Sequence, residues 1–450
     1  MIQRGFIFDS NRCTGCNACQ LACTLENQLA FTVSWRQIVS FNPDHLPGHP
    51  TFHLSLACNH CSNPDCLKYC PALAYYKDPL SGHVLLNSDH CIGCKYCSWV
   101  CPYDAPVYDP VSGLMTKCTF CDQRYREGRD PACIALCPTG ALKSDLLDTK
   151  NNTFEIAGFP LSNMKPAINI IPFRRGGEPP GEIPSSFDPE LIDRYRKTLN
   201  SSTQKISLRS EWTLMVFTLL SAILVGDAVA EIFKNGFLPP LLYICLLAVT
   251  FGISLLHLGR KMRAFRAILN SRRSWLSREI LFFSIFALLI SVKLMGGNNS
   301  FYLELAAAFF GIYALYAMDQ VYRILPGRDK GKWHSASVLL TALLWVSVIS
   351  GYDIGWVILL TIKAWLFFRY HFSLSSPRSS PVFNMLIIIR MVAGFIILPL
   401  GIYFTVLSGI ISILTLMIAE ITDRILFYLG LCVTSPAEKM IRDLDTVIRP

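Results

Sequence analysis

The chain has 450 residues, a net charge of +9 at pH 7, a mean hydropathy of +0.38 and only 16% charged residues. Soluble domains average about 25% charged residues, so a large part of this protein is expected to lie in a membrane. Basic patches with interleaved aromatic residues are missing, which argues against nucleic-acid binding; the positive charge bears on membrane topology instead.

The first third of the chain is rich in cysteine: sixteen of the 18 cysteines lie between residues 13 and 137. The N-terminal segment MIQRGFIFDSNR has neither the apolar core of a signal peptide nor a twin-arginine motif, so a secreted disulfide scaffold is not expected. The spacing of the cysteines then decides between disulfides, zinc and iron–sulfur clusters.

The cysteines fall into four groups of four. Groups one and three, CTGCNACQLAC and CIGCKYCSWVC, have the C-x2-C-x2-C-x3-C spacing of ferredoxins with two [4Fe–4S] clusters, and groups two and four are longer versions. Zinc ribbons use two CxxC pairs per ion and have no need of a trailing cysteine. The sequence therefore predicts four [4Fe–4S] clusters. The predicted ligands are Cys13, Cys16, Cys19 and Cys23; Cys58, Cys61, Cys66 and Cys70; Cys91, Cys94, Cys97 and Cys101; and Cys118, Cys121, Cys133 and Cys137.

Four quartets in this order resemble the iron–sulfur subunit of the dimethyl sulfoxide reductase family of molybdopterin oxidoreductases. The resemblance implies that each cluster takes three thiolates from one group and the fourth from another. The implied sets are Cys13, Cys16, Cys19 with Cys137; Cys118, Cys121, Cys133 with Cys23; Cys58, Cys61, Cys66 with Cys101; and Cys91, Cys94, Cys97 with Cys70. The related nitrate reductase subunit has Trp at the second position of group three, where this chain has Cys94, so all four clusters are expected to be [4Fe–4S].

Residues 1–148 are therefore expected to form an α+β domain of the double bacterial-ferredoxin type. Residues 149–210 are rich in Pro, Gly, Ser and Asn, which is typical of a linker. Within them the stretch FPLSNMKPAINIIPF, residues 159–173, is more apolar. It fits either an ordered surface loop or a segment that docks on a partner, as such segments do in the resembling family.

Residues 211–432 contain eight apolar stretches of about the length that crosses a bilayer. An all-α eight-helix transmembrane bundle is expected, because lipid offers the backbone no hydrogen-bond partners. The predicted spans are 212–233, 237–258, 276–295, 301–324, 335–351, 353–370, 382–405 and 409–431, followed by a C-terminal tail over 433–450. The motifs EWTLMVFT, HLGRKMRAF and AEITDRILFY resemble the anchor subunit of the same family, so the chain resembles a fusion of the electron-transfer and anchor subunits.

Basic residues are unevenly distributed over the loops between these spans. The loops after spans two, four and six contain thirteen Lys and Arg residues, whereas the opposite loops contain Lys234 and Lys293. Short loops rich in Lys and Arg remain in the cytoplasm. The charges therefore predict a multi-pass protein of the inner membrane with its iron–sulfur domain on the cytoplasmic face, unlike the exported members of the family.

His257 and Glu279 flank the most basic loop, HLGRKMRAFRAILNSRRSWLSRE. Oxidation of a quinol releases two protons with two electrons, and His or a partly buried Glu accepts protons near neutral pH. The matching residues of the resembling anchor belong to its quinol site, which implies quinol or menaquinol as the substrate here. Arg263 fits either a quinol oxygen or an anionic lipid, and solvation at a helix end is the alternative for His257 and Glu279.

Several other charged residues lie within the predicted spans, where they are costly and mark function or pairing. Glu420 and Arg424 are four residues apart, which predicts a pair along one helix. A b-type haem is not expected, because it needs two axial ligands inside the bundle and the other candidates beside His257, namely His334 and His371, lie at span ends. The other intramembrane charges are Asp227, Asp319, Lys363, Arg390 and Asp423.

Together these patterns predict the electron-transfer and anchor subunit of an anaerobic respiratory oxidoreductase. Quinol is oxidised in the membrane, electrons pass through four clusters, and a separate molybdopterin subunit carries the terminal catalytic site; the chain has no nucleophile motif, P-loop or pterin-binding segment of its own. One alternative is electron flow through the same clusters in the opposite direction. A partner would then oxidise formate, hydrogen or a sulfur compound, and the electrons would reduce quinone. The other is an ion-translocating membrane module driven by the clusters.

Overall fold

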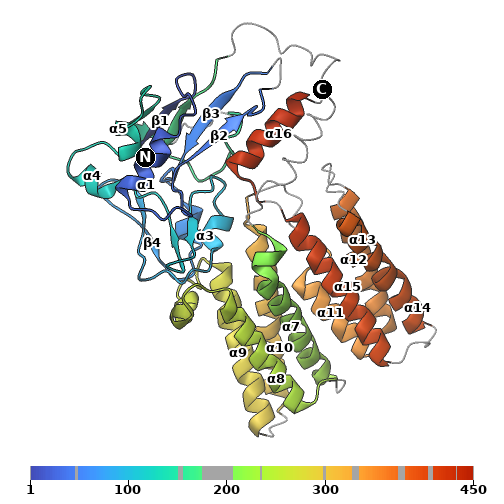
Figure 1. Cartoon of the computed structure of the whole chain (residues 1–450). Helices are drawn as coiled ribbons and strands as arrows, with labels where there is room; N and C mark the ends of the chain where they lie inside the picture. Colours follow the sequence, from blue (N-terminus) through green and yellow to red (C-terminus); the bar gives the residue numbers. More distant parts are fainter. Residues whose placement is uncertain are drawn as a thin grey trace. The chain divides into compact units, whose positions relative to one another are not determined.

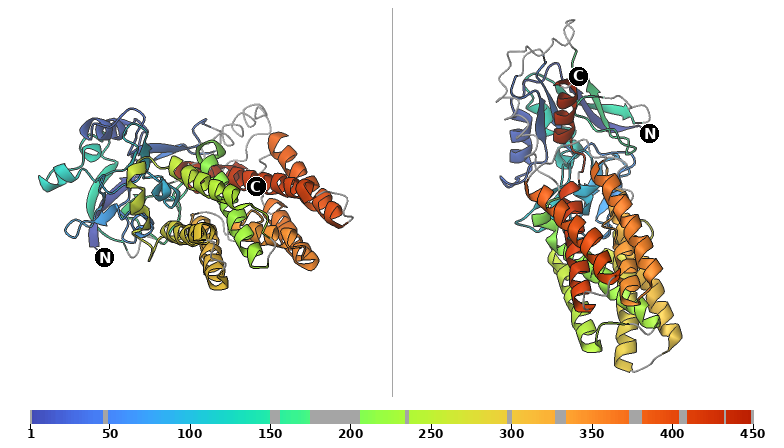
Figure 2. Two further views of the ribbon diagram at one scale, coloured as in Figure 1. Left: turned by 90° about the horizontal axis from the view of Figure 1, so that it is seen from below. Right: turned by 90° about the vertical axis from the view of Figure 1, so that its right-hand side faces the viewer.

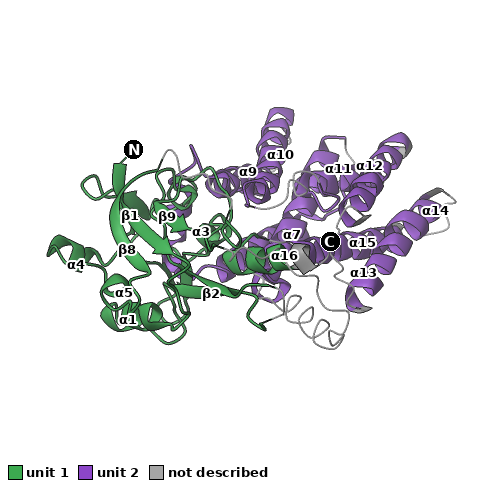
Figure 3. Cartoon of the chain, turned by 90° about the horizontal axis from the view of Figure 1, so that it is seen from above, with its two compact units in different colours: residues 1–205, 433–450 green, residues 206–432 purple. Residues whose placement is uncertain are grey.

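The computed structural model describes residues 2–45, 49–149, 156–174, 206–233, 236–296, 300–326, 334–372, 381–403, 409–431 and 433–448. Small sheets and short helices make up one part of the chain and long helices the other (Figures 1 and 2). The chain divides into two compact units (Figure 3): a cysteine-rich unit, residues 1–205 with 433–450, and a helical unit, residues 206–432.

A three-stranded sheet forms the centre of the cysteine-rich unit. Strand β1 (Ile2–Asp9) pairs antiparallel with β8 (Leu142–Asp148) and parallel with β9 (Ile168–Ile171). Phe6 and Phe8 alternate toward the core and are each 1% exposed. Three hairpins complete the unit: β2 (Gln37–Phe41) with β3 (Phe52–Leu56), β4 (Tyr75–Lys77) with β5 (Val84–Leu86), and β6 (Val107–Asp109) with β7 (Leu114–Thr116).

Short helices lie beside the cysteines of this unit. They are α1 (Ala18–Glu26), α2 (Asp65–Lys68), α3 (Tyr96–Trp99), α4 (Asp122–Arg126) and α5 (Ala132–Ala135). Strands and short helices in this arrangement agree with the predicted α+β class of the N-terminal domain.

The apolar stretch 159–173, predicted as a surface loop or docking segment, contributes to the core of its own unit. Ile168 and Ile170 are 4% and 5% exposed, and β9 pairs residue by residue with Phe6–Asp9 of β1. Burial of alternate isoleucines on a paired strand explains why this part of the predicted linker is apolar. Residues 150–155 and 175–205 of that linker lie outside the described residues.

The C-terminal tail is also part of the cysteine-rich unit. Helix α16 (Pro436–Ile448) packs on β2 and inserts Met440 and Leu444 into the same core as Phe6. Gly158 permits this contact, because a Cβ there would lie 2.3 Å from the Met440 sulfur, and its N–H donates to Asp443 at 2.7 Å. Since the chain leaves and re-enters one folded unit, the segment between must cross a membrane an even number of times.

The helical unit has a helix in each of the eight predicted ranges. They are α7 (Leu208–Ile232), α8 (Pro240–Leu256), α9 (Trp275–Gly296), α10 (Phe301–Arg323), α11 (Val338–Ile349), α12 (Asp353–Phe372), the interrupted helix α13 (Pro381–Met391), η3 (Val392–Ile397) and α14 (Leu398–Tyr403), and α15 (Gly409–Gly430). A 3₁₀ segment, η1 (Lys261–Ile268), follows α8 at a bend of 100°. Helix α7 packs against α8, α10, α11 and α15.

The number of helices suited to span a membrane is smaller than the eight predicted. Among the described helices four are long and apolar enough, or up to five if α8 and η1 together form one broken span. Helices α8 and α11 have only 17 and 12 residues, and charged residues interrupt α12 and α15. The even number of crossings required by α16 excludes five.

Candidate functional site

All four cysteine motifs begin with a CxxC loop that bends in the same way. The residue before the second cysteine has a left-handed backbone conformation in each loop. These residues are Gly15 (φ 71°), His60 (φ 43°), Gly93 (φ 69°) and Phe120 (φ 63°). Glycine adopts this conformation freely, whereas a bulky residue bears a strain of roughly 1–3 kcal/mol. The turn brings the N–H of Gly93 to 3.4 Å from Cys91 Sγ, and that of Phe120 to 3.3 Å from Cys118 Sγ.

The cysteines gather in four sets, each of which mixes two motifs. Burial raises the pKa of Cys61, and the neighbouring thiols of Cys58, Cys101 and Cys66 raise it further. Cys101 belongs to group three in the sequence, so this set draws three thiols from one motif and one from another.

The other three sets follow the same rule. Their members are Cys97 with Cys94, Cys70 and Cys91; Cys13 with Cys19, Cys137 and Cys16; and Cys23 with Cys133 and Cys121, which Cys118 joins. Burial, and then the like charges of neighbouring thiols, raise the pKa of Cys97, and the same two causes raise that of Cys118. Cys19 also acts on Cys23, and Cys58 also acts on Cys118, so the sets adjoin one another, and the ligand sets implied by the family resemblance stay a prediction.

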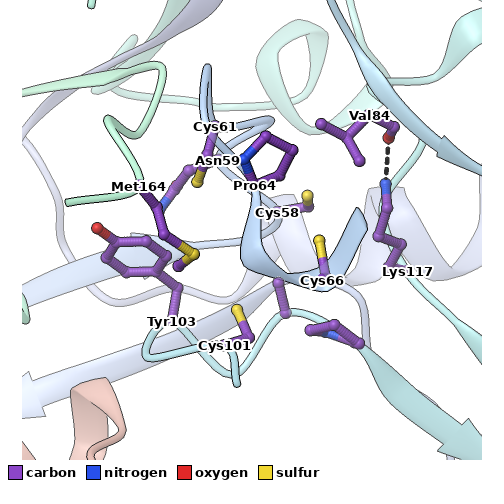
Figure 4. Close-up of a pocket in the computed structure, with 12 residues that line it drawn as sticks. Cys58, Asn59, Cys61, Pro64, Cys66, Val84, Cys101, Tyr103, Lys117 and Met164 are labelled. Carbon is purple, nitrogen blue, oxygen red and sulfur yellow. Dashed lines mark hydrogen bonds between the residues drawn. The ribbon is translucent and has the colours of Figure 1, made fainter. Parts of the chain in front are cut away.

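One of the thiol sets lines a pocket. All sixteen of these cysteines are free thiols. Cys58, Cys61, Cys66 and Cys101 line one and the same pocket (Figure 4). Thiols around an open space suit a cubane of iron and sulfide, for which each thiol must lose its proton.

One of the four sets lies at the surface. Cys16 is exposed, and Cys13 and Cys137 are half-buried, whereas each of the other sets has at least three buried cysteines. Burial of Cys137 is slight, and backbone N–H groups such as that of Leu142 lower the pKa of its thiol. Cys13, Cys16, Cys19 and Cys137 thus form a surface set, which reaches the outside of the cysteine-rich unit.

Two buried cations lie among the thiols, and neither was predicted from the sequence. Arg36 is 1% exposed and lies beside the set of Cys23 and Cys118. Lys117 is 3% exposed, lines the cavity of Figure 4, and donates to the carbonyl oxygens of Val84 and Cys118. Both are single basic residues outside the CxxC pattern, so no motif marks them.

Two buried histidines accompany Lys117. Burial, and then the charge of Lys117, lowers the pKa of His60 well below its usual value and that of His83 to about 4. Both imidazoles are therefore neutral at pH 7, and their rings pack on Phe120. They shield the thiols from water without adding charge.

The predicted quinol residues lie at the ends of helices in the helical unit. His257 ends α8 and is half-buried, Arg263 lies on η1, and Glu279 lies in the second turn of α9 with 6% exposure. The described elements α8, η1 and α9 pack on one another. The interactions of Glu279, however, are with residues of other helices.

Glu279 belongs to a buried polar cluster that the sequence did not reveal. Asp319 and Tyr322 of α10 lie within electrostatic reach of Glu279, and the Tyr322 hydroxyl is 2.5 Å from that of Tyr428 on α15. Glu211, near the start of α7, approaches the same two tyrosines. Four helices thus contribute one residue or more to this acid–tyrosine cluster, which no local spacing could indicate.

Comparison with known proteins matches both units. Residues 50–146 match the model of the 4Fe-4S dicluster domain, and residues 207–376 match that of the DMSO reductase anchor subunit (DmsC). A component of the anaerobic dimethyl sulfoxide reductase of Haemophilus influenzae is 41% identical over 165 residues, which are 34% of this chain and 80% of the relative. The protein belongs to the dimethyl sulfoxide reductase family.

Other relatives of this family show the same coverage. A component of the polysulfide reductase of Wolinella succinogenes is 38% identical over 38% of this chain and 96% of its own length. The thiosulfate reductase electron transfer subunit PhsB of Salmonella typhi is 37% identical over 32% of this chain and 75% of its own length. The chain is thus an iron–sulfur electron-transfer protein with the family's membrane anchor fused to it.

The helical unit also contains a buried network of charged side chains, which we call the ionic network. Lys363 of α12 lies 2.8 Å from Glu420, and Arg390 of α13 lies 3.2 Å from Asp423 and 3.6 Å from Glu420. Each of these four residues is at most 1% exposed. Thr341 of α11 donates to Glu420 at 2.6 Å.

The predicted pair between Glu420 and Arg424 is therefore wrong. Glu420 pairs with residues of other helices, and Arg424 donates to Thr218 of α7 at 3.1 Å and to Thr341 of α11 at 3.3 Å. In a buried bundle, a charge pairs with whichever opposite charges and hydrogen-bonding groups the neighbouring helices bring to it, and these need not lie on its own helix.

Two of the other intramembrane acids bind backbone amides. Asp227 accepts from Phe237 N–H at 2.9 Å, and Asp319 accepts from Val338 N–H at 2.8 Å at the start of α11. These contacts fix a loop and a helix end, which gives both residues a structural role.

The ionic network predicts that two substitutions are not additive. Glu420→Gln removes an anion and leaves two cations, Lys363 and Arg390, facing Asp423, so we expect a loss of about 3–5 kcal/mol in stability. Lys363→Met leaves Arg390 facing two anions and should also destabilise the protein, whereas the double variant keeps the balanced pair of Arg390 and Asp423 and should lose less than the sum of the two single losses. Thermal unfolding of the detergent-solubilised protein measures this; additive losses in the double variant would contradict the network.

Proposed function

We propose that this chain oxidises quinol, through its helical unit, and passes the electrons through four [4Fe–4S] clusters to a separate molybdopterin reductase subunit. The observation that supports the proposal is the gathering of sixteen cysteines into four mixed sets in a chain that also contains a family anchor domain. When bound, a [4Fe–4S] cluster accepts and donates one electron at a time. The relatives are parts of reductases, which supports a catalytic site on another chain.

The thiol sets provide a route with a defined end. Three sets are mostly buried and exclude water, while the set with exposed Cys16 reaches the surface. A catalytic partner docked over Cys16 receives electrons there without any change in the fold of this chain.

Proton release at the quinol requires acceptors within the helical unit. We place His257 and Glu279 on the side of the cysteine-rich unit, because both follow the two crossings that we propose for α7 and α8. The tyrosines and acids around Glu279 extend the hydrogen-bonding groups available to the released protons. We propose His257 and Glu279 as acceptors, Arg263 as a contact for a quinol oxygen, and no haem between quinol and clusters.

We also propose eight crossings and a cytoplasmic cysteine-rich unit. Eight helices occupy the predicted ranges, and eight is an even number as α16 requires. The loops on the side of the cysteine-rich unit carry the excess of Lys and Arg.

A second function remains supported by one relative. A component of the sulfite dehydrogenase of Allochromatium vinosum is 34% identical over 39% of this chain and 85% of its own length. Its name describes an oxidation, so the same arrangement of clusters also suits electron flow from a partner to quinone. The potentials of the clusters relative to the quinone pool distinguish the two directions.

Cluster content is the first prediction of this proposal. Anaerobically purified protein should contain about sixteen iron and sixteen sulfide per chain, since four cubanes hold four of each. Iron and sulfide analysis measures both. A content near eight iron per chain, or one zinc ion per cysteine set, would contradict the assignment of four [4Fe–4S] clusters.

The quinol site gives the second prediction. His257→Ala should slow quinol-driven reduction of the clusters by about 10²–10⁴-fold, the usual contribution of a general base, and Glu279→Gln should have a smaller effect. Stopped-flow absorbance or EPR follows the reduction. Dithionite should reduce the clusters of both variants at the wild-type rate, because no thiol is altered. If His257→Ala oxidised quinol at the wild-type rate, His257 would be a solvated residue at a helix end without a role in proton transfer.

Membrane topology gives the third prediction. A cysteine inserted between Arg272 and Arg273 should be shielded from impermeant maleimide in right-side-out vesicles and labelled in inverted ones. A cysteine inserted next to Gly296, on the opposite side, should show the reverse pattern. Labelling of the first site from outside would overturn the cytoplasmic assignment.

A further inference from the structure

Arg36 is a deeply buried cation of the cysteine-rich unit, and no carboxylate among the described residues forms an ion pair with it. Its exposure is 1%. Only Nη1 has oxygen acceptors in the described part of the protein, the carbonyl and hydroxyl oxygens of Ser55, both at 3.1 Å. Nε and Nη2 are buried without one. A buried charge without an anionic partner is strongly unfavourable, so an anion must face this guanidinium.

The fold places Arg36 among cysteine thiols, which carry negative charge once a cluster is bound. Phe6, beneath the guanidinium, contacts Phe120 in the loop between Cys118 and Cys121, with 4.6 Å between the ring centres. The thiols that act most strongly on the charge of Arg36 are Cys133, Cys118, Cys19 and Cys23. Three of these four belong to one set, that of Cys23, Cys118, Cys121 and Cys133, which we call the Arg36 set. The fourth, Cys19, belongs to the adjacent surface set and lies 3.3 Å from Ser55 Oγ, so that Ser55 connects it to Arg36.

The position of Arg36 is fixed by the fold. It immediately precedes β2, and its guanidinium lies over the ring of Phe6 on β1, 4.6 Å from the ring centre. The stacking on Phe6 and the two bonds to Ser55 hold the charge in place. A fixed charge in a water-excluded position is screened far less than one at the surface.

We propose that Arg36 sets the reduction potential of the cluster in the Arg36 set, making it a better electron acceptor than the same cluster without this cation. One-electron reduction adds one negative charge to the cluster, and the electron comes from a neighbouring cluster or an added reductant. A fixed positive charge stabilises the reduced form more than the oxidised form, because net charge is one of the factors that set the potential. Arg36 is therefore a positioning residue for charge that touches no substrate.

This role has a consequence for the path of electrons. A cluster with a raised potential holds an electron next to the surface set, from which a partner draws it. The inference rests on the proposed function only in assuming that the Arg36 set holds a cluster. It is independent of the substrate of the partner and of the quinol site.

The test compares three variants of the full chain by EPR-monitored redox titration. In Arg36→Met, the reduction potential of one EPR signal should fall by at least about 59 mV. This corresponds to a tenfold lower equilibrium constant for one-electron reduction of that cluster. Arg36→Lys keeps the charge and should retain most of the wild-type potential. The EPR signal of the cluster in the Arg36 set is identified with Cys121→Ser, which alters a ligand of that set. The EPR signal of the cluster in the surface set should shift less in Arg36→Met.

Arg126→Met is the matched control. Arg126 lies on α4, five residues after Cys121, but its side chain is 67% exposed and pairs with Asp122 in solvent. Removal of a screened charge so close in sequence should leave the potential unchanged. An equal shift in Arg126→Met would mean that any nearby cation acts alike, and it would overturn the specific role of Arg36.

Three other results would also overturn the inference. One is an unchanged potential in Arg36→Met at wild-type iron content. Another is loss of the cluster in both Arg36→Met and Arg36→Lys, since lysine keeps the charge. The third is a Cys121→Ser variant that alters no EPR component. A wild-type content near eight iron would instead refute the fourfold proposal, and the Arg36 shift would still be measurable on the component that Cys121→Ser alters.

Discussion

The exchange of the fourth thiol between motifs is the constraint on which the cysteine-rich unit depends. Each mixed set can form only if residues far apart in the sequence meet around one pocket, as do Cys58, Cys61, Cys66 and Cys101. In each CxxC loop, the residue before the second cysteine has a left-handed backbone conformation, which bends the loop. This conformation strains the backbone wherever the residue is not glycine, as at His60 and Phe120. Cluster binding and folding are therefore coupled, because buried thiols with raised pKa values lose their protons only to a metal centre.

The helical unit is under a second constraint, which comes from its two ends. Both the segment that precedes α7 and helix α16 belong to the cysteine-rich unit, where Met440 and Leu444 complete a core that includes Phe6. A membrane segment between two parts of one soluble unit must return to its starting side. Packing of α16 holds the C-terminal end of the chain in the cysteine-rich unit, and the distribution of basic loops agrees with a membrane segment that starts and ends on one side.

Sequence patterns predicted what depends on local spacing and could not predict what depends on distant contacts. The cysteine groups, the apolar stretches and the family resemblance were all recognisable, and the structure has helices in each of the predicted membrane ranges. The burial of residues 159–173, the place of α16, and the partners of Glu420 and Glu279 depend on tertiary packing. Arg36 was overlooked for the same reason: one arginine before a strand has no pattern, and only the fold shows that it faces thiols instead of water.

The most direct test of the account is whether thiols from different motifs serve one cluster. In single variants, Cys137→Ser should alter the same EPR component as Cys16→Ser and leave unchanged the component altered by Cys121→Ser, although Cys121 and Cys137 lie in the same motif. The fold brings Cys137 to Cys13 and Cys16, so this crossed pattern is required. If Cys137→Ser and Cys121→Ser altered the same component, each motif would hold its own cluster and the account would be contradicted.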